Sequence, residues 1–264
     1  MPTIQQVTDY LESIAPPYLQ ESYDNAGLIV GEPGTEVTGI LTSLDCTEEI
    51  IEEATKRGCN LVVAHHPIVF RGLKRLNGAN YVERTVIKAI RENVAIYAIH
   101  TNLDNVRHRG VNERIAERLG LTDQRLLRAK NEDGTVGSGM VGELPEPLAE
   151  KDFLALLREK MQATVVRHTA LLGQPVQTVA VAGGAGGFLL ADAKRAGAQV
   201  FVTADYKYHE FFDADGEIVI CDIGHYESEQ FTTQLLAELL TKEFTTFAVL
   251  STERNTNPVR YTFG

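Results

Sequence analysis

Residues 39–66, GILTSLDCTEEIIEEATKRGCNLVVAHH, contain the clearest indication of the fold class. An apolar run is followed by helical spacing of apolar residues, and then by a second apolar run that ends in two histidines. The helical part extends over Thr47–Arg57, and Gly58 follows it as a stop signal. A strand, a helix and a second strand in this order predict a parallel pair of strands.

The same alternation of strands and helices continues on both sides of this stretch. A capping box at Thr3 and Gln6 predicts an N-terminal helix that ends before Pro16. The later part of the first half predicts three more elements: a helix over 81–92, a buried strand over 93–100 and a helix over 111–119. The sequence therefore predicts an α/β fold with mixed sheets flanked by helices.

An internal similarity predicts that the fold consists of two related lobes. Residues 39–66 align without a gap on residues 178–205, TVAVAGGAGGFLLADAKRAGAQVFVTAD, with strand, loop, helix, glycine and strand in the same order. Coincidence is the alternative explanation, because many βαβ units share this pattern. A duplication predicts one lobe over 1–128 and a second over 129–264, with a metal site between them. The C-terminal part of the second lobe is expected to pack back on the first.

Charge and composition restrict the possible partners. A formal net charge of −11 argues against a general attraction to nucleic acid or to anionic membranes. No signal-peptide pattern is seen, and no stretch approaches the roughly eighteen apolar residues of a transmembrane helix, so a cytoplasmic location is expected. Three cysteines without CxxC spacing argue against disulfides and thiolate zinc sites, which leaves the seven histidines as the likeliest metal donors.

Polar side chains collect where the predicted strands end, which is where α/β sheets bind ligands. The residues concerned are His65 and His66, His100 and Asp104, His225, Glu227 and Glu229, and, in the repeat, Asp205 and His209. Each has a simpler explanation when taken alone: Asp104 could cap the next helix, and Glu229 could compensate a helix dipole. Their combination predicts a metal site.

Five of these residues are the predicted ligands of two divalent metal ions: His65, His66, Asp104, His225 and Glu229. Pro67 interrupts strand alternation, so the adjacent histidines can turn toward one site or bind different ions of a pair. His225 and Glu229 can face the same ion if one helix contains both. Five donors leave open coordination positions, as in catalytic sites, and they fit Zn, Fe, Mn or Ni equally.

Four segments in chain order resemble those of the GTP cyclohydrolase 1 type 2 homologues, also called Nif-three-like dinuclear-metal hexameric proteins. They are YDNAGLIVG (23–31), AHHPIVF (64–70), IHTNLDN (99–105) and IGHYESE (223–229). The resemblance covers essentially the whole chain, although Tyr23 stands where many relatives have Trp. It implies the same five metal ligands and a toroidal homohexamer whose sites face an internal cavity. It also implies that His100 and His209 either support the ligands from behind or transfer protons.

Three functions stay open at this point. The resemblance favours a hydrolase in which a metal-bound hydroxide attacks a small-molecule substrate, such as the imidazole ring of GTP. A phosphoesterase is one alternative, in which Arg71, Lys74 and Arg75 would meet phosphates. The other is a hexameric scaffold that binds or delivers metal with little turnover. No P-loop is present, and the GGAGG segment at 183–187 either cradles an anion or forms a tight turn.

Overall fold

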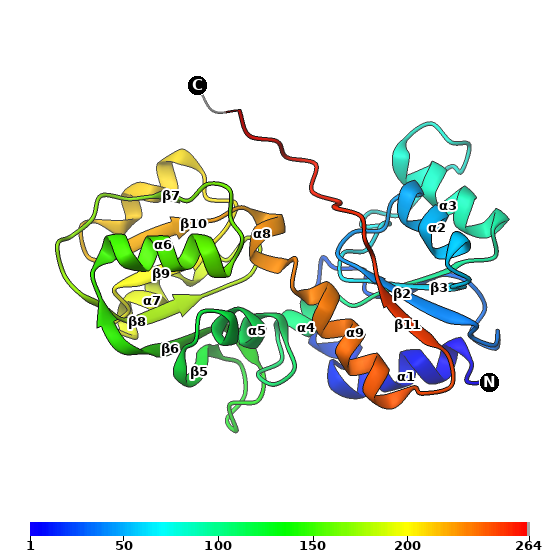
Figure 1. Ribbon diagram of the computed structural model, residues 1–264, viewed down its shortest axis with the longest axis horizontal. Helices are drawn as coiled ribbons and strands as arrows, with labels where there is room; N and C mark the ends of the chain where they lie inside the picture. The colour runs from blue at the N-terminus through cyan, green and yellow to red at the C-terminus, as the bar shows by residue number, and fades with distance from the viewer. Residues whose placement is uncertain (263–264) are drawn as a thin grey trace. The chain divides into compact units, whose positions relative to one another are not determined.

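The computed structural model describes residues 1–262, which form two compact units. Unit 1 comprises Met1–Leu103 and Thr232–Arg260, and unit 2 comprises Asp104–Phe231 together with Tyr261 and Thr262. Each unit has its own mixed sheet flanked by helices, which confirms the predicted fold class (Figure 1). The division into domains at residue 129 stays a prediction; by packing, residues 104–128 belong to unit 2 and residues 232–260 to unit 1.

The sheet of unit 1 has five strands in the order β1-β4-β3-β2-β11. Their bounds are Gly27–Val30 for β1, Gly39–Ser43 for β2, Leu61–Ala64 for β3, Ala95–Ala98 for β4 and Ala248–Ser251 for β11. Strands β4, β3, β2 and β11 are parallel, and β1 is antiparallel to β4. The carboxyl ends of β3 and β4 therefore lie next to each other at one edge of the sheet.

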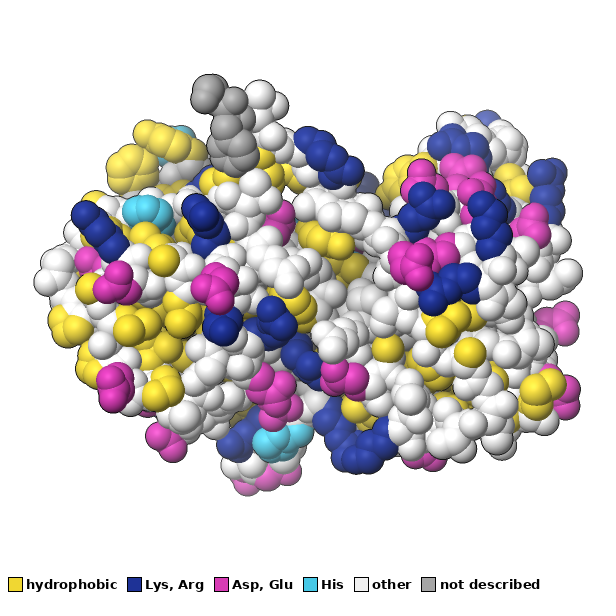
Figure 2. All heavy atoms as spheres, viewed as in Figure 1, with side chains coloured by type: hydrophobic (Ala, Val, Ile, Leu, Met, Phe, Trp, Pro, Cys, Tyr) yellow, Lys and Arg dark blue, Asp and Glu magenta, His cyan; other side chains and the backbone are white. Residues whose placement is uncertain are grey.

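The helices of unit 1 cover both faces of this sheet (Figure 1). They are α1 (Ile4–Ile14), the 3-10 helix η1 (Pro17–Leu19), α2 (Glu48–Lys56), α3 (Tyr81–Arg91) and α9 (Thr232–Glu243), while α4 (Thr101–Asp104) leads out of the unit. The predicted capping box at Thr3 is present. Helices α2 and α3 bury a core of aliphatic side chains. Basic and acidic groups lie side by side on the outer surface of these helices (Figure 2). One ion pair there joins Arg84 to Glu48.

The sheet of unit 2 has six strands in the order β5-β6-β8-β9-β10-β7. Their bounds are Thr122–Ala129 for β5, Gly137–Leu148 for β6, Arg167–His168 for β7, Val176–Val181 for β8, Val200–Thr203 for β9 and Val219–Asp222 for β10. Strands β8, β9 and β10 are parallel, and the other pairs are antiparallel. The parallel part again presents its carboxyl ends at one edge.

Except for α6 (Glu150–Lys160), the helices of unit 2 are short. The others are α5 (Val111–Arg118), η2 (Gly187–Leu189), α7 (Leu190–Arg195), η3 (Tyr208–Ala214) and α8 (His225–Glu229). Strand β9 falls on β3 in the gapless alignment of the two halves, which supports the hypothesis of a duplication. Within residues 1–262, no helix combines the length and the apolar character that a membrane crossing requires.

Candidate metal centre

Unit 1 brings three histidines together at the carboxyl ends of two paired strands. Strand β3 ends at Ala64, so His65 and His66 follow it outside the alternation of the strand, and His100 follows β4. The distances between their ring centroids are 4.9, 5.3 and 5.4 Å. One nitrogen of each ring lies within 4.8 Å of the other two. These three imidazoles form a cluster that could bind a metal ion.

Each ring of this cluster is oriented by an acceptor at its Nδ1. The distance from Nδ1 to oxygen is 2.8 Å in all three cases: His65 to the carbonyl of Ile99, His66 to Asp45 and His100 to Asp24. A carbonyl or carboxylate oxygen can only accept, so Nδ1 carries the proton and donates. In a neutral imidazole the lone pair is then on Nε2, which is the arrangement of a histidine that binds metal through Nε2.

Asp24 holds both His100 and the start of α4 in place. Its carboxylate accepts hydrogen bonds from His100 Nδ1 and, at 3.0 Å, from the backbone N–H of Thr101, whose hydroxyl donates to it as well. Burial by itself raises the pKa of Asp24, but the hydrogen bonds and the attraction of His100 outweigh it and lower the pKa from 3.8 to about 2. The carboxylate is therefore ionised across the neutral range.

Substitution of Asp24 by Asn should weaken the fold in a pH-dependent way. A carboxyl group whose pKa falls on folding stabilises the protein above its unfolded pKa, and this stabilisation disappears as the pH drops through the folded pKa. We expect Asp24→Asn to lower the free energy of unfolding by about 2 kcal/mol at neutral pH. Urea unfolding should show this difference shrinking as the pH falls from about 4 toward 2.

The exposed carboxyl of Asp215 provides the control for this measurement. The Asp215→Asn protein should unfold like the unmutated protein at every pH. A stability difference for Asp24→Asn that does not change with pH would contradict the assigned ionisation.

Unit 2 places His225 and Glu229 one turn apart on α8. Glu229 is buried, with 4% of its side chain exposed, and its Oε2 lies 3.0 Å from His225 Nε2. His225 Nδ1 lies 2.8 Å from Asp205 Oδ2. Burial alone lowers the pKa of His225, but the two carboxylates raise it from 6.5 to about 11. A cation is thus stabilised at this place, and a metal ion would compete with the proton for the same atoms.

The structure meets the condition for this pair, that one helix contain both residues. This helix is the short α8, and the longer helix α9 that follows begins only at Thr232. The spacing of four residues brings His225 and Glu229 together, because both belong to α8.

A glycine-rich loop after β8 packs directly against this pair. A Cβ atom on Gly184 would lie 2.6 Å from Glu229 Oε1 and 3.2 Å from His225 Cε1, and one on Gly183 would lie 3.2 Å from Glu229 Cγ. The backbone N–H of Gly184 donates to Ser228 Oγ at 3.0 Å, and Gly184 has a φ of +59°. The GGAGG segment is therefore a tight turn that lets the backbone approach the two side chains.

Asp104 and His209 are the remaining residues predicted for the site. Asp104 is the last residue of α4, and its backbone carbonyl accepts from Asn112 Nδ2 at 3.0 Å. The alternative that Asp104 caps the next helix is wrong, because Gly110 is the N-cap of α5. His209 is exposed on η3, where its ring contacts Tyr208 and Phe212. Its role in proton transfer stays a prediction.

Sequence reasoning missed that carboxylates orient the histidines. Asp45 and Asp205 each lie two residues after a strand, β2 and β9 respectively, and contact His66 and His225. Asp205 also occupies the position that aligns with His66 in the internal comparison. The sequence was sufficient to place Asp45 and Asp205 at the carboxyl ends of strands. It was not sufficient to predict which histidines they contact.

Comparison with known proteins confirms the resemblance. A family model described as Duf34/NIF3 (NGG1p interacting factor 3) matches residues 2–258. A GTP cyclohydrolase 1 type 2 homolog of Clostridium perfringens is 33% identical over 227 residues, or 86% of each chain. One of Lactococcus lactis is 31% identical and covers 96% of this chain and 98% of its own. A Staphylococcus aureus hypothetical protein of known crystal structure has a TM-score of 0.92 at 30% identity, covering 98% of this chain and 99% of that one. The chain therefore belongs to the Duf34/NIF3 family.

Proposed function

We propose that the chain is a divalent-metal-dependent hydrolase with a dinuclear centre. The proposed ligands are His65 and His66 from unit 1 and Asp104, His225 and Glu229 from unit 2. One observation carries the proposal: His65 and His66 converge in unit 1 with Nδ1 bound to acceptors, which makes Nε2 the nitrogen that would bind a metal. The imidazole and carboxylate donors suit Zn, Fe, Mn or Ni.

The surrounding residues fit this role. Asp45 and Asp205 hold the rings of His66 and His225, as acceptors do behind metal-binding histidines. The two metal ions would supply an activated water and positive charge for a developing oxyanion. We propose that His100 transfers a proton at Nε2, because Asp24 holds its ring through Nδ1. We propose His209, exposed to water, as a second proton carrier.

The substrate class follows from the relatives. Because curated relatives carry the name GTP cyclohydrolase 1 type 2 homolog, we propose a nucleotide such as GTP, opened at its imidazole ring, as the first substrate to test. We also propose that the chain forms a homohexamer, which sedimentation would reveal.

A phosphoesterase is the second candidate function. Arg71, Lys74 and Arg75 are exposed and follow the His-His-Pro segment, and within residues 1–262 none of them forms an ion pair. Three uncompensated cations in a chain with a net charge of −11 are suited to meet phosphate groups.

Product analysis separates these functions. Protein supplied with Zn, Fe, Mn or Ni is incubated with GTP and with p-nitrophenyl phosphate, while formate and phosphate release are followed. We expect formate from GTP with the unmutated protein, and none with His66→Ala or Glu229→Ala. Phosphate without formate would favour the phosphoesterase. If the protein retains metal but releases neither formate nor phosphate, the result contradicts a hydrolase. It then favours a role in metal binding or delivery.

A further inference from the structure

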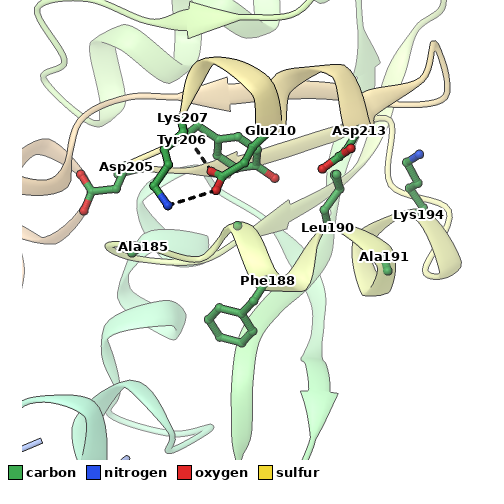
Figure 3. A pocket seen from close by; sticks show the side chains of 12 residues that line it. Ala185, Phe188, Leu190, Ala191, Lys194, Asp205, Tyr206, Lys207, Glu210 and Asp213 are labelled. Atoms are coloured by element: carbon green, nitrogen blue, oxygen red, sulfur yellow. Dashed lines mark hydrogen bonds and ion pairs between the residues drawn. The ribbon is translucent and has the colours of Figure 1, made fainter. Parts of the chain in front are cut away.

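A pocket of about 730 Å³ lies in unit 2 between the loop after β8, helix α7 and the 3-10 helix η3 (Figure 3). This volume is typical of sites for small molecules. Its apolar wall includes Leu190 and Ala191, at the start of α7, and Ala204, which follows β9. Phe188 points to the other side of the loop in Figure 3. Asp205, the partner of His225, belongs to the pocket lining, so a bound molecule would lie beside a proposed metal ligand.

A buried hydroxyl group in this lining lacks a partner. Tyr206 is 3% exposed, and within residues 1–262 its hydroxyl oxygen makes no hydrogen bond. The tyrosine ring lies against Gly187, where an added Cβ atom would be 3.4 Å from Cε2 of Tyr206. Leaving a buried hydroxyl unsatisfied costs about 1–3 kcal/mol. A ligand with a hydrogen-bonding group can remove this cost.

The charges around the pocket leave one carboxylate uncompensated. The other charged side chains of the lining are paired: Lys194 with Glu217, Lys207 with Glu210, and Asp205 with His225. Asp213 lines the pocket from η3, and it forms no ion pair with any residue between 1 and 262. In Figure 3, Asp213 lies above Leu190, so carboxylate and apolar wall face the same space.

Electrostatics at Tyr206 agree with a preference for positive charge. Burial raises the pKa of its hydroxyl, and Glu210 and Asp213 raise it further. The hydroxyl therefore stays protonated, with an oxygen that can accept a hydrogen bond from a cation.

We propose that this pocket binds a small organic molecule with a protonated amine. The ammonium group donates to the Asp213 carboxylate and to the Tyr206 hydroxyl oxygen, while the apolar body packs against Leu190 and its neighbours. Neither Tyr206 nor Asp213 is a proposed metal ligand. The inference thus goes beyond the proposed hydrolase. Amine binding is measured with a chelator present, so its result is independent of whether the protein is a metal-dependent hydrolase.

Calorimetric titration with simple amines tests this inference. Phenethylamine and hexylamine carry the required charge and apolar body, and N-acetylphenethylamine is the matched neutral control. We expect the amines to bind the full chain, and the N-acetyl compound to bind at least about tenfold more weakly, because a charge-assisted hydrogen bond contributes about 1.5–3 kcal/mol.

Three variants locate the binding site. Asp213→Asn should weaken phenethylamine binding by about tenfold, and Tyr206→Phe by about three- to tenfold. Asp215→Asn, an exposed carboxyl just past η3, should bind like the unmutated protein. Asp213 is exposed, so its variant tests the inference even if Tyr206→Phe unfolds. The inference is overturned if neither amine binds, if the N-acetyl compound binds equally well, or if Asp213→Asn leaves affinity unchanged.

Discussion

Replacement of His66 by alanine should remove metal from the centre and stop hydrolysis. The metal content of metal-replete protein should fall from about two ions per chain to about one or fewer, because an open catalytic site has no spare protein ligand. We expect turnover to fall by at least about 100-fold, since even the loss of a residue that only orients a metal ligand can cost that much. Elemental analysis after gel filtration measures the metal, and formate release measures turnover.

His108 provides the matched control for this substitution. It is an exposed histidine that contacts Glu113 and joins no cluster of candidate ligands within residues 1–262. His108→Ala should therefore retain both metal and activity. If His66→Ala keeps the metal content of the unmutated protein, His66 is not a ligand and the proposed set of five is wrong.

A single methyl group at Gly184 should also disrupt the centre, although no ligand side chain is replaced. The added Cβ would lie 2.6 Å from Glu229 Oε1, too close for both atoms to keep their places. Glu229 is buried and held by α8, so we expect it to shift away from His225. The metal affinity of Gly184→Ala should fall by about tenfold or more, as it does when a metal ligand loses its orientation.

Gly173→Ala separates this clash from backbone strain. Both glycines have positive φ, +59° at Gly184 and +75° at Gly173, so alanine costs roughly 1–2 kcal/mol of strain at either position. A Cβ on Gly173 meets no atom within 4 Å. Gly173→Ala should therefore lower the melting temperature and leave metal binding intact. Equal metal affinities for the two variants would rule out the predicted displacement of Glu229.

Local sequence patterns were sufficient to predict most of the elements. Thr3 and Gln6 gave the start of α1, and the apolar runs in residues 39–66 gave β2, α2 and β3 within one or two residues. Strands β5 and β11 were not predicted. The strand β5 is largely exposed and lacks a clear alternation, and β11 pairs with β2 across about two hundred residues, for which no local signal exists.

The sequence predicted which residue types would gather at the candidate site better than it predicted how their side chains are oriented. The positions of His65, His66 and His100 after strands were sufficient to predict that donors gather at one edge of the sheet. Their ring orientations depend on Asp45 and Asp24, which are distant in the chain and reach the histidines only through tertiary structure. The convergence of His100 with the adjacent pair also required the register of β3 and β4.

The placement of β11 and α9 has a consequence for how the protein is made. Unit 1 begins with the first residue but needs Thr232–Arg260 to be complete, whereas the main segment of unit 2, Asp104–Phe231, is continuous. A chain emerging from the ribosome therefore exposes β2 as an unpaired edge strand until β11 arrives. Unit 2 can fold first, and the nascent N-terminal segment is the part most in need of protection from aggregation during synthesis.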